Sequence, residues 1–371
     1  MSIEFQKQGY FIPDFLLKIK DVEIPQRAIN NLIIQYDMFK PYVYGEIEIV
    51  SDLDIYPLIE FDGECEMSLK ATDGLKFSTL ENFILHELSN TKMDNNQFCL
   101  RGKFYDVASH ELQKYFICKS FKDKKLQDLI NEFKDDFDKT KKDTDYKDTE
   151  TLEYFIFDPS LHVLDNIDNI SDSFGVRFFH THSKLKILPL ENILSQKLKK
   201  IGNENMRAVF PPEVDGNPFN IIEYKNTDLQ GLNVAQQSVK RKMYSYNPLD
   251  RKNTLTEYNL KQANEDLGLL DDNTEKSGEG FVFSYYSNTN AEIKLKQDLR
   301  IQSLFNSQFS FLQGGCLGLD VGDTILLDIS NGKDLDKQKS GKYLVSSVTD
   351  KYTQGYLTQM VRVVRPSPAK E

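Results

Sequence analysis

The chain has 371 residues, of which 39% are hydrophobic and 12% aromatic, and this is more than one domain needs to bury a core. Its formal net charge of −11 makes the surface repel phosphate backbones, which excludes the basic footprint of a sequence-specific nucleic-acid-binding protein. The sequence contains neither an apolar run of membrane-span length nor the basic and apolar start of a signal peptide, so we expect a soluble chain that ordinary secretion does not export.

The N-terminal part of the sequence alternates between apolar and polar side chains, which is the period of half-buried antiparallel strands. In residues 64–71, one face carries the apolar side chains from Cys65 to Ala71. Similar strand-like runs cover 14–24, 27–37, 44–50, 77–93 and 97–109. Because no crossover helix separates these runs, they predict a β-barrel or a β-sandwich.

Helical spacing replaces this alternation after residue 110. Ser120 and Asp123 form a capping-box-like start of a helix. The apolar residues that follow at helical spacing are Leu126, Leu129, Ile130, Phe133 and Phe137. The polar stretch 134–151 is predicted to be a solvated loop.

A second helix is indicated by Asp158 as its N-cap, Pro159 at its first position and Gly175 at its end. Its buried stripe consists of Leu161, Leu164, Ile167, Ile170 and Phe174. A hairpin follows, with strands VRFFHT and LKILPL and a turn near Ser183. The two helices and the hairpin predict a small α/β domain at 111–200.

Strands return beyond residue 200. The predicted strands are 219–225, 237–247, 324–329, 341–348 and 356–364. Between them, residues 263–280 contain six acidic residues and one lysine, which is typical of an exposed and mobile segment. The tail PSPAKE at the end of the chain is predicted to be frayed.

Residues 290–305 fit two patterns. Ile293, Leu295, Leu299 and Ile301 alternate as in a strand, whereas Ala291, Leu295 and Leu299 would line one side of a helix. The period by itself favours the strand.

Candidate metal ligands are His180 and His182, because residues i and i+2 of a strand project to the same face. The sequence offers no third ligand at a sensible spacing, and exposed polar residues are expected at a hairpin turn, so we favour a solvated turn. The widely spaced cysteines Cys65, Cys99, Cys118 and Cys316 fit neither a disulfide scaffold nor a zinc ribbon. We expect buried, reduced thiols in a chain that folds in a reducing cytosol.

Other candidate sites have simpler explanations. The glycines of 314–318, followed by Gly322-Asp323, lack the Lys-Ser/Thr of a phosphate loop and are predicted to form tight β-turns. The acidic pairs Asp135-Asp136 and Asp271-Asp272 lie in polar segments, and the basic run 239–246 is predicted to be a solvated strand edge. We therefore assign no catalytic, cofactor-binding or metal-ligating residue and expect no enzymatic activity.

The order of these elements resembles the baseplate hub proteins of contractile-tailed bacteriophages, which are related to the N-terminal part of type VI secretion spike proteins. The resemblance is carried by three stretches: the helix that ends in "FG" before an aromatic strand (158–179), the segment YNPLDRKNTLTEYNL (246–260) and the closing pattern of 317–352. In that family the segment that matches 290–305 is helical, so we expect a helix there.

The resemblance implies a mainly β fold with α/β insertions, built from two antiparallel tube-like β-barrels and smaller α/β domains. The expected divisions are a first barrel at 1–110, an α/β domain at 111–200, a second barrel at 201–250 and 308–366, and an insertion with a helix at 251–307.

The resemblance also implies a trimeric ring. Two barrels in each subunit would mimic two tail-tube subunits, so that three copies could join a six-fold tail tube to a three-fold spike. The implied partners are the other copies of the chain, the tail tube protein, the central spike protein and other baseplate proteins. DNA would meet the ring only in transit, and no membrane is involved. The implied location is the tail baseplate of a virion that assembles in the host cytoplasm.

Two alternatives stay open. One is another tail-tip component with the same tube-like barrels. The other is a peptidoglycan-acting or metal-dependent hydrolase on β-domains, for which His180 and His182 are the best candidate site.

Overall fold

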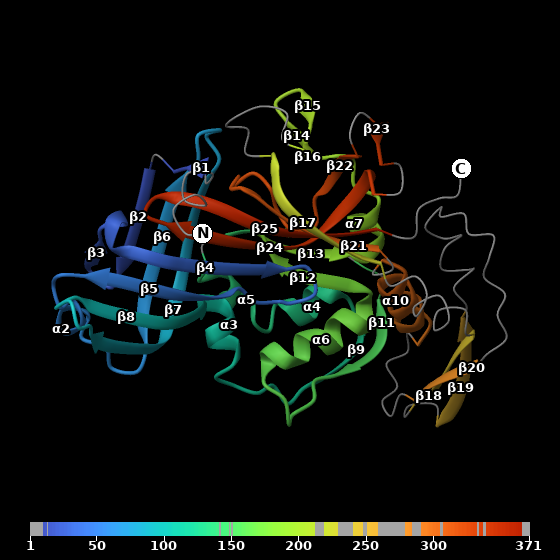
Figure 1. Cartoon of the computed structure of the whole chain (residues 1–371). Helices are drawn as coiled ribbons and strands as arrows, with labels where there is room; N and C mark the ends of the chain where they lie inside the picture. Colours follow the sequence, from blue (N-terminus) through green and yellow to red (C-terminus); the bar gives the residue numbers. More distant parts are fainter. Residues whose placement is uncertain are drawn as a thin grey trace.

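Antiparallel strands dominate the computed structural model, as the sequence predicts for a mainly β fold. The model describes residues 10–12, 14–140, 142–147, 149, 151–211, 219–228, 240–247, 251–258, 279–283, 291–304, 307–331, 334–336 and 339–365. Within these residues, fifteen strands belong to one large sheet that curls round on itself (Figure 1).

The predicted N-terminal strands are confirmed. They are β2 (Asp14–Ile19), β3 (Val22–Ile24), β4 (Ile29–Asp37), β5 (Tyr44–Ser51), β6 (Cys65–Thr72), β7 (Ser78–Lys92) and β8 (Phe98–Asp106), and β1 (Tyr10–Phe11), which the sequence did not indicate, precedes them. A short 3-10 helix, η1 (Gln26–Ala28), precedes β4, and a short helix, α2 (Tyr56–Ile59), follows β5. The alternation in β6 buries Cys65, Met67, Leu69 and Ala71, so this face points into the core.

Two long C-terminal strands complete a first circuit of paired strands. They are β24 (Gly341–Thr353) and β25 (Tyr356–Arg365), which form a hairpin. The second half of β24 pairs with β4, and the start of β25 pairs with β1, which directly precedes β2 in the chain. The first circuit therefore runs β4-β5-β8-β7-β6-β2/β1-β25-β24 and returns to β4.

The same hairpin also belongs to a second circuit. Its other strands are β16 (Arg207–Phe210), β17 (Ile221–Asp228), β21 (Ser307–Gly314) and β22 (Thr324–Asn331). They pair in the order β24-β25-β21-β17 on one side and β24-β22-β16 on the other. A bridge between Val209 and Asn220, at the start of β17, joins the two ends. In Figure 1, β24 and β25 cross from the strands of the first circuit to those of the second.

The elements between β8 and β14 form an α/β module on one side of this hairpin (Figure 1). Its elements are α3 (Val107–Leu112), β9 (Ser120–Lys124), α4 (Leu126–Ile130), α5 (Lys134–Asp138), β10 (Asp143–Tyr146), β11 (Leu152–Ile156), α6 (Val163–Phe174), β12 (Val176–His180), β13 (Lys184–Pro189) and α7 (Leu190–Leu194). The strands form a three-stranded sheet, β10-β13-β12, and a separate pair, β9-β11.

The starts of the predicted helices need correction. Ser120 and Asp123 lie in strand β9, and the first helix begins at Leu126, where the Asp128 side chain accepts from the Lys125 backbone N–H. The five predicted apolar residues are buried, but they do not share one helix: Leu126, Leu129 and Ile130 lie in α4, Phe133 is the N-cap of α5, and Phe137 lies in α5. The segment 134–151 is not a solvated loop throughout, because it contains α5 and β10.

The start of the second helix is also corrected. Asp158 caps a turn by accepting from the backbone N–H and hydroxyl of Ser160, and α6 begins later, at Val163. The N-cap of this helix is His162, whose side chain makes no capping hydrogen bond, rather than Asp158. The predicted end is confirmed, since Gly175 has a left-handed conformation with φ of 71°.

The insertion contributes β19 (Lys252–Tyr258), β20 (Glu279–Phe283) and α10 (Ala291–Leu304), which confirms the helix expected at 290–305. Strand β18 (Lys240–Asn247) is confirmed as a strand, but it pairs with β19 and β20 in a separate small sheet, in the order β19-β18-β20. The expected second barrel at 201–250 and 308–366 included this strand, but among the described residues β18 pairs with no strand of either circuit. Most of the acidic segment 263–280 and the tail 366–371 lie outside the described residues.

Three short strands complete the described structure: β14 (Lys200–Ile201), β15 (Glu204–Asn205) and β23 (Asp334–Leu335). One hydrophobic core runs through both circuits, and a second core fills the α/β module. Cys65, Cys99 and Cys316 are buried free thiols, as predicted, whereas Cys118 is exposed. Among the residues that the model describes, no helix has the length and apolar character needed to cross a membrane.

Candidate functional site

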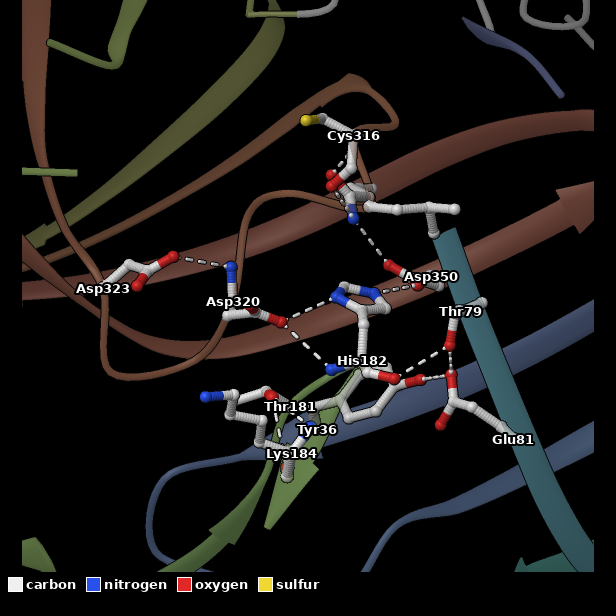
Figure 2. Close-up of polar contacts among 12 residues, drawn as sticks. Tyr36, Thr79, Glu81, Thr181, His182, Lys184, Cys316, Asp320, Asp323 and Asp350 are labelled. Carbon is white, nitrogen blue, oxygen red and sulfur yellow. Dashed lines mark hydrogen bonds and ion pairs between the residues drawn. The ribbon is translucent and has the colours of Figure 1, made fainter. Parts of the chain in front are cut away.

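The turn between β12 and β13 enters the seam between the α/β module and the shared β24–β25 hairpin. Thr181 and His182 in this turn are each 2% exposed, so the prediction of a solvated turn is wrong. The turn is buried because the first circuit and the β21–β22 loop pack over it, which local sequence spacing does not reveal. Figure 2 shows His182 surrounded by side chains from these separate segments.

His182 is held between two aspartates of the C-terminal region. Its Nε2 lies 2.7 Å from Asp350 Oδ2, and its Nδ1 lies 2.8 Å from Asp320 Oδ1. The His182 backbone N–H donates to the same Asp320 oxygen at 3.0 Å. Because both ring nitrogens face carboxylate oxygens, His182 is an imidazolium that donates two charge-assisted hydrogen bonds.

The charges on this group follow from burial and from its neighbours. Burial opposes the charge on His182, but the carboxylates of Asp350 and Asp320 raise its pKa well above the ordinary 6.5. Burial likewise opposes ionisation of Asp320, but the His182 imidazolium lowers the pKa of Asp320 to about 2. The structure therefore holds a buried, charged imidazolium–carboxylate group rather than a titrating histidine at neutral pH.

A second buried ion pair, between Lys142 of the α/β module and Glu81 of the first circuit, lies next to His182. Lys142 Nζ donates to Glu81 Oε2 at 2.9 Å and to the Thr181 carbonyl at 2.7 Å. Tyr36 on β4 donates to the other Glu81 oxygen, and its ring lies 4.9 Å from the His182 ring. Thr181 is thereby connected to Glu81 of the first circuit through Lys142, and the His182 ring packs against Tyr36 of the same circuit.

The set Tyr36, Glu81, Lys142, His182, Asp320 and Asp350 is called the His182 joint below. It connects β4 and β7 of the first circuit, the β12–β13 turn of the α/β module, the β21–β22 loop and the shared strand β24. Lys199 extends it, with Nζ at 2.9 Å from Asp323, whose carboxylate accepts from the Asp320 backbone N–H at 3.0 Å.

The glycine-rich loop after β21 is fixed by protein groups, as the turn interpretation predicts. The Gln359 side chain accepts from the Cys316 N–H at 2.9 Å and donates to the Cys316 carbonyl at 3.1 Å. Asp73 accepts from the Leu317 N–H at 2.9 Å. A Cβ on Gly315 would lie 1.9 Å from Leu357 Cγ, so the glycine is needed for close packing. These backbone N–H groups already donate to protein acceptors and are therefore not available to bind a phosphate.

The two histidines do not converge on a common ligand position. Strand β12 ends at His180, so the strand alternation that would align His180 with His182 no longer applies. His180 lies toward Asp106, with Nε2 at 3.8 Å from Asp106 Oδ1, and burial lowers its pKa below 6.5. No group of three or more His, Cys, Asp or Glu that could hold a metal ion occurs in the described part of the chain.

The remaining candidates are part of ordinary surface structure. Asp136 pairs with Lys139 at 2.8 Å and accepts from the Tyr115 hydroxyl at 2.7 Å, so it stabilises α5 and is not a free acid. Asp271-Asp272 lies outside the described residues. The basic run belongs mainly to β18, which is the central strand of its small sheet and not an edge.

Sequence reasoning missed the carboxylates of the joint, although the sequence contains a signal for them. Val348, Asp350 and Tyr352 alternate inward on β24, and Thr79, Glu81 and Phe83 do so on β7. An acidic residue at an inward position of an apolar strand face requires a buried partner. The partners themselves could not be read from the sequence, because they are distant along the chain: Asp350 pairs with His182, 168 residues away, and Glu81 pairs with Lys142, 61 residues away.

Comparison with solved structures shows which fold this is. The chain superposes on a tail protein from Neisseria meningitidis with a TM-score of 0.66 and 10% identity, over 97% of this chain and 98% of that one. It superposes on the 43 kDa tail protein of prophage MuSo2 from Shewanella oneidensis with a TM-score of 0.60 and 11% identity, covering 96% and 98%.

A third similar structure is an E. coli component of the type VI secretion system, described as similar to the phage T4 tail proteins gp27 and gp5. Here the TM-score is 0.53 at 8% identity, and the alignment covers 96% of this chain and 80% of that one. No protein-family model and no curated protein matches the chain. The chain therefore has a fold shared by phage-type tail proteins and a type VI secretion component, as the sequence resemblance predicts.

Proposed function

We propose that this chain is a structural hub of a phage-type tail baseplate. In this proposal three copies form a ring that joins a six-fold tail tube to a three-fold central spike and lets the genome pass through. The observation that carries the proposal is the pair of strand circuits that share β24 and β25. If each circuit acts as one tube-like barrel, one chain offers two similar modules, and three chains offer six.

The His182 joint fits this role. A hub transmits force between a tube and a spike, so the two circuits and the α/β module must keep a fixed relative position. The joint ties all three with buried, charge-assisted hydrogen bonds, of which the His182–Asp350 contact is 2.7 Å. Chemistry on a substrate is not favoured here, because a 2% exposed imidazolium with both nitrogens occupied cannot accept a proton.

The proposed partners are further copies of this chain, a tail tube protein, a central spike protein and neighbouring baseplate proteins, with DNA only in transit. The acidic net charge of −11 suits a channel through which DNA slides without binding. The proposed location is the virion tail, assembled in the cytoplasm of a bacterial host. The similar solved structures support this through their fold.

Light scattering and electron microscopy of the purified chain test the proposal. We expect a ring-shaped homotrimer that binds tube protein on one rim and spike protein on the other. Binding to only one of these partners would assign the chain to a different position in the tail tip. A monomer that binds neither would refute the hub.

A further inference from the structure

His180 lies at the boundary between the two hydrophobic cores. It is the last residue of β12, a strand that contacts β4 of the first circuit. Phe178 packs in the core of the α/β module, whereas the next residue, Phe179, packs in the core that runs through both circuits. The His180 side chain has no exposed surface. A change at this side chain therefore acts on the contact between the module and the first circuit.

The ring of His180 is buried without a hydrogen bond of normal geometry. Neither ring nitrogen has such a partner in the described part of the chain. Asp106 Oδ1 lies 3.8 Å from Nε2, which is beyond hydrogen-bond reach. Because nearly all buried polar groups in proteins are hydrogen-bonded, a buried histidine of this kind requires an explanation.

Asp106 is held in place by other donors. Its Oδ1 accepts from the Ser109 backbone N–H at 2.9 Å, which caps α3. Its Oδ2 accepts from the Val43 N–H at 2.8 Å and from the Ser109 hydroxyl. Asp106 therefore cannot move toward His180 without disturbing the cap of α3 and the bond to Val43.

The groups around His180 determine its charge. Burial is the largest effect and lowers the pKa of His180 below the ordinary 6.5, and the Lys142 ammonium lowers it further. The carboxylates of Asp106 and Glu81 and the carbonyl of Pro41 raise this pKa, but they do not outweigh burial. Glu81 is already paired with Lys142 at 2.9 Å. His180 is therefore neutral at neutral pH.

We propose that proton uptake by His180 in mild acid opens the contact between the α/β module and the first circuit. An imidazolium at this position is a buried cation with two N–H donors, and a buried charge without hydrogen bonds is costly. The charge is stable only where water reaches it, so the protonated chain separates the β12–β13 turn from β7 and β8. This acid-sensitive contact does not depend on the proposed function.

Hydrogen exchange measured by mass spectrometry tests the opening in the full chain. At pH 7.5, the peptide that covers β12 and β13 should be strongly protected. At pH 5, after correction for the chemical exchange rate, its protection should fall by about tenfold or more, because an unfolded histidine takes up a proton below about pH 6.5. The peptide that covers β2, a strand that pairs only with β3 and β6, should keep its protection.

Two substitutions remove the titrating group. His180→Phe keeps a ring and loses no hydrogen bond, because neither ring nitrogen makes one within the described residues. His180→Gln places a neutral amide at the same position and serves if the phenylalanine does not fit. In both variants, the peptide that covers β12 and β13 should keep the same protection at pH 5 as at pH 7.5.

His86 offers a matched control. Its pKa is also lowered mainly by burial, but it lies on β7, where its ring stacks on Tyr105 at 4.9 Å. His86→Phe therefore removes a histidine of the same kind outside the β12–β13 turn. This variant should lose protection of the β12–β13 peptide at pH 5 as the wild type does.

The proposal is supported if the wild type and His86→Phe lose protection of this peptide in acid and the His180 variants keep it. It is overturned if the wild type is equally protected at both pH values, or if the His180 variants lose protection as the wild type does. Loss of protection in the β2 peptide as well would show global unfolding and also overturn it. The wild type provides an independent check, because uptake of one proton changes protection by at most about tenfold per pH unit. A steeper dependence would rule out a single histidine.

Discussion

His182 carries the positive charge that compensates the buried carboxylates of Asp350 and Asp320. It faces Asp350 at 2.7 Å and Asp320 at 2.8 Å, and all three side chains are largely withdrawn from water. Removing one partner of a buried ion pair leaves the other charge without compensation, which costs about 3–5 kcal/mol.

The substitution His182→Gln should therefore lower the free energy of unfolding by about 3–5 kcal/mol. Asp350→Asn should cost less, because His182 keeps Asp320 as a counter-ion and the Asn amide can still accept from Gln359, which donates to Asp350 at 2.8 Å. The double variant should cost less than the sum of the two single variants. Urea denaturation at one fixed protein concentration measures all three. A His182→Gln variant within about 0.5 kcal/mol of wild type would show that the joint does not stabilise the fold.

Because His182 is charged in the folded chain, the direction in which it changes the free energy of unfolding with pH can be predicted. The pKa of His182 in the folded chain lies well above 6.5, whereas an unfolded histidine loses its proton near about 6.5. The stabilisation from His182 is therefore complete below about pH 6.5 and is lost as the pH rises through the folded-state pKa, with a limiting slope of about 1.4 kcal/mol per pH unit. Asp320, with a pKa of about 2, acts on the acid side, where its stabilisation is lost as the pH falls from 3.8 toward 2.

Denaturation of wild type and His182→Gln between pH 5 and 9 checks this effect. We expect the difference in unfolding free energy between the two chains to shrink as the pH rises. His86 and His180, whose pKa values are lowered mainly by burial, contribute with the opposite sign in both chains and so cancel in the difference. A difference that stays constant across this range would contradict the assignment of a charged His182.

At the scale of elements, Gly175 connects the end of α6 to helix α10. Its φ of +71° is a left-handed conformation, and a Cβ at this position would lie 2.8 Å from Ile293 Cγ2 of α10. Gly202 offers a matched control, because its φ is +61° and its Cβ would meet nothing within 4 Å. Both substitutions to alanine should therefore show the same backbone strain of about 1–2 kcal/mol, but only Gly175→Ala disturbs a contact between helices.

We expect Gly175→Ala to destabilise the chain by more than Gly202→Ala, by roughly 1–3 kcal/mol of additional overpacking cost. Chemical denaturation of the two variants side by side gives the difference. A second Ile293→Ala substitution should recover part of the loss at Gly175 and nothing at Gly202. Equal costs for the two glycines would mean that α10 does not pack firmly against the end of α6.

Elements with strong periodic signals could be predicted from the sequence, and those fixed by distant partners could not. Strand β6 was recognisable because its alternation of buried and exposed residues is complete. Strand β21 was missed although Phe309 and Phe311 alternate in it, because its flanking segment also fits a helix. Turn residues 181–183 look solvated by composition, and only the packing of the first circuit and the β21–β22 loop makes His182 a buried joint.

At the scale of the whole molecule, the shared hairpin makes the two circuits mutually dependent. The first half of β24 pairs with β22 of the second circuit, and its second half pairs with β4 of the first. Neither circuit can lose this hairpin without opening the other, and one hydrophobic core extends through both. We therefore expect the two circuits to unfold together, unlike two barrels joined by a linker.

The absence of tryptophan from the chain makes this expectation measurable. A single Tyr105→Trp substitution on β8 reports on the first circuit, and a single Tyr224→Trp on β17 reports on the second. Both fluorescence signals should follow the same urea transition, with the same midpoint and slope.

Truncations in the core test the coupling of the circuits directly. Leu32→Ala on β4 and Leu327→Ala on β22 remove fully buried side chains, and each should destabilise the chain by about 2–5 kcal/mol. Each truncation should shift both reporters equally. If the β17 reporter in the Leu327→Ala chain unfolds at a lower urea concentration than the β8 reporter, the circuits are separate folding units. The shared hairpin would then join the two circuits without making their unfolding cooperative.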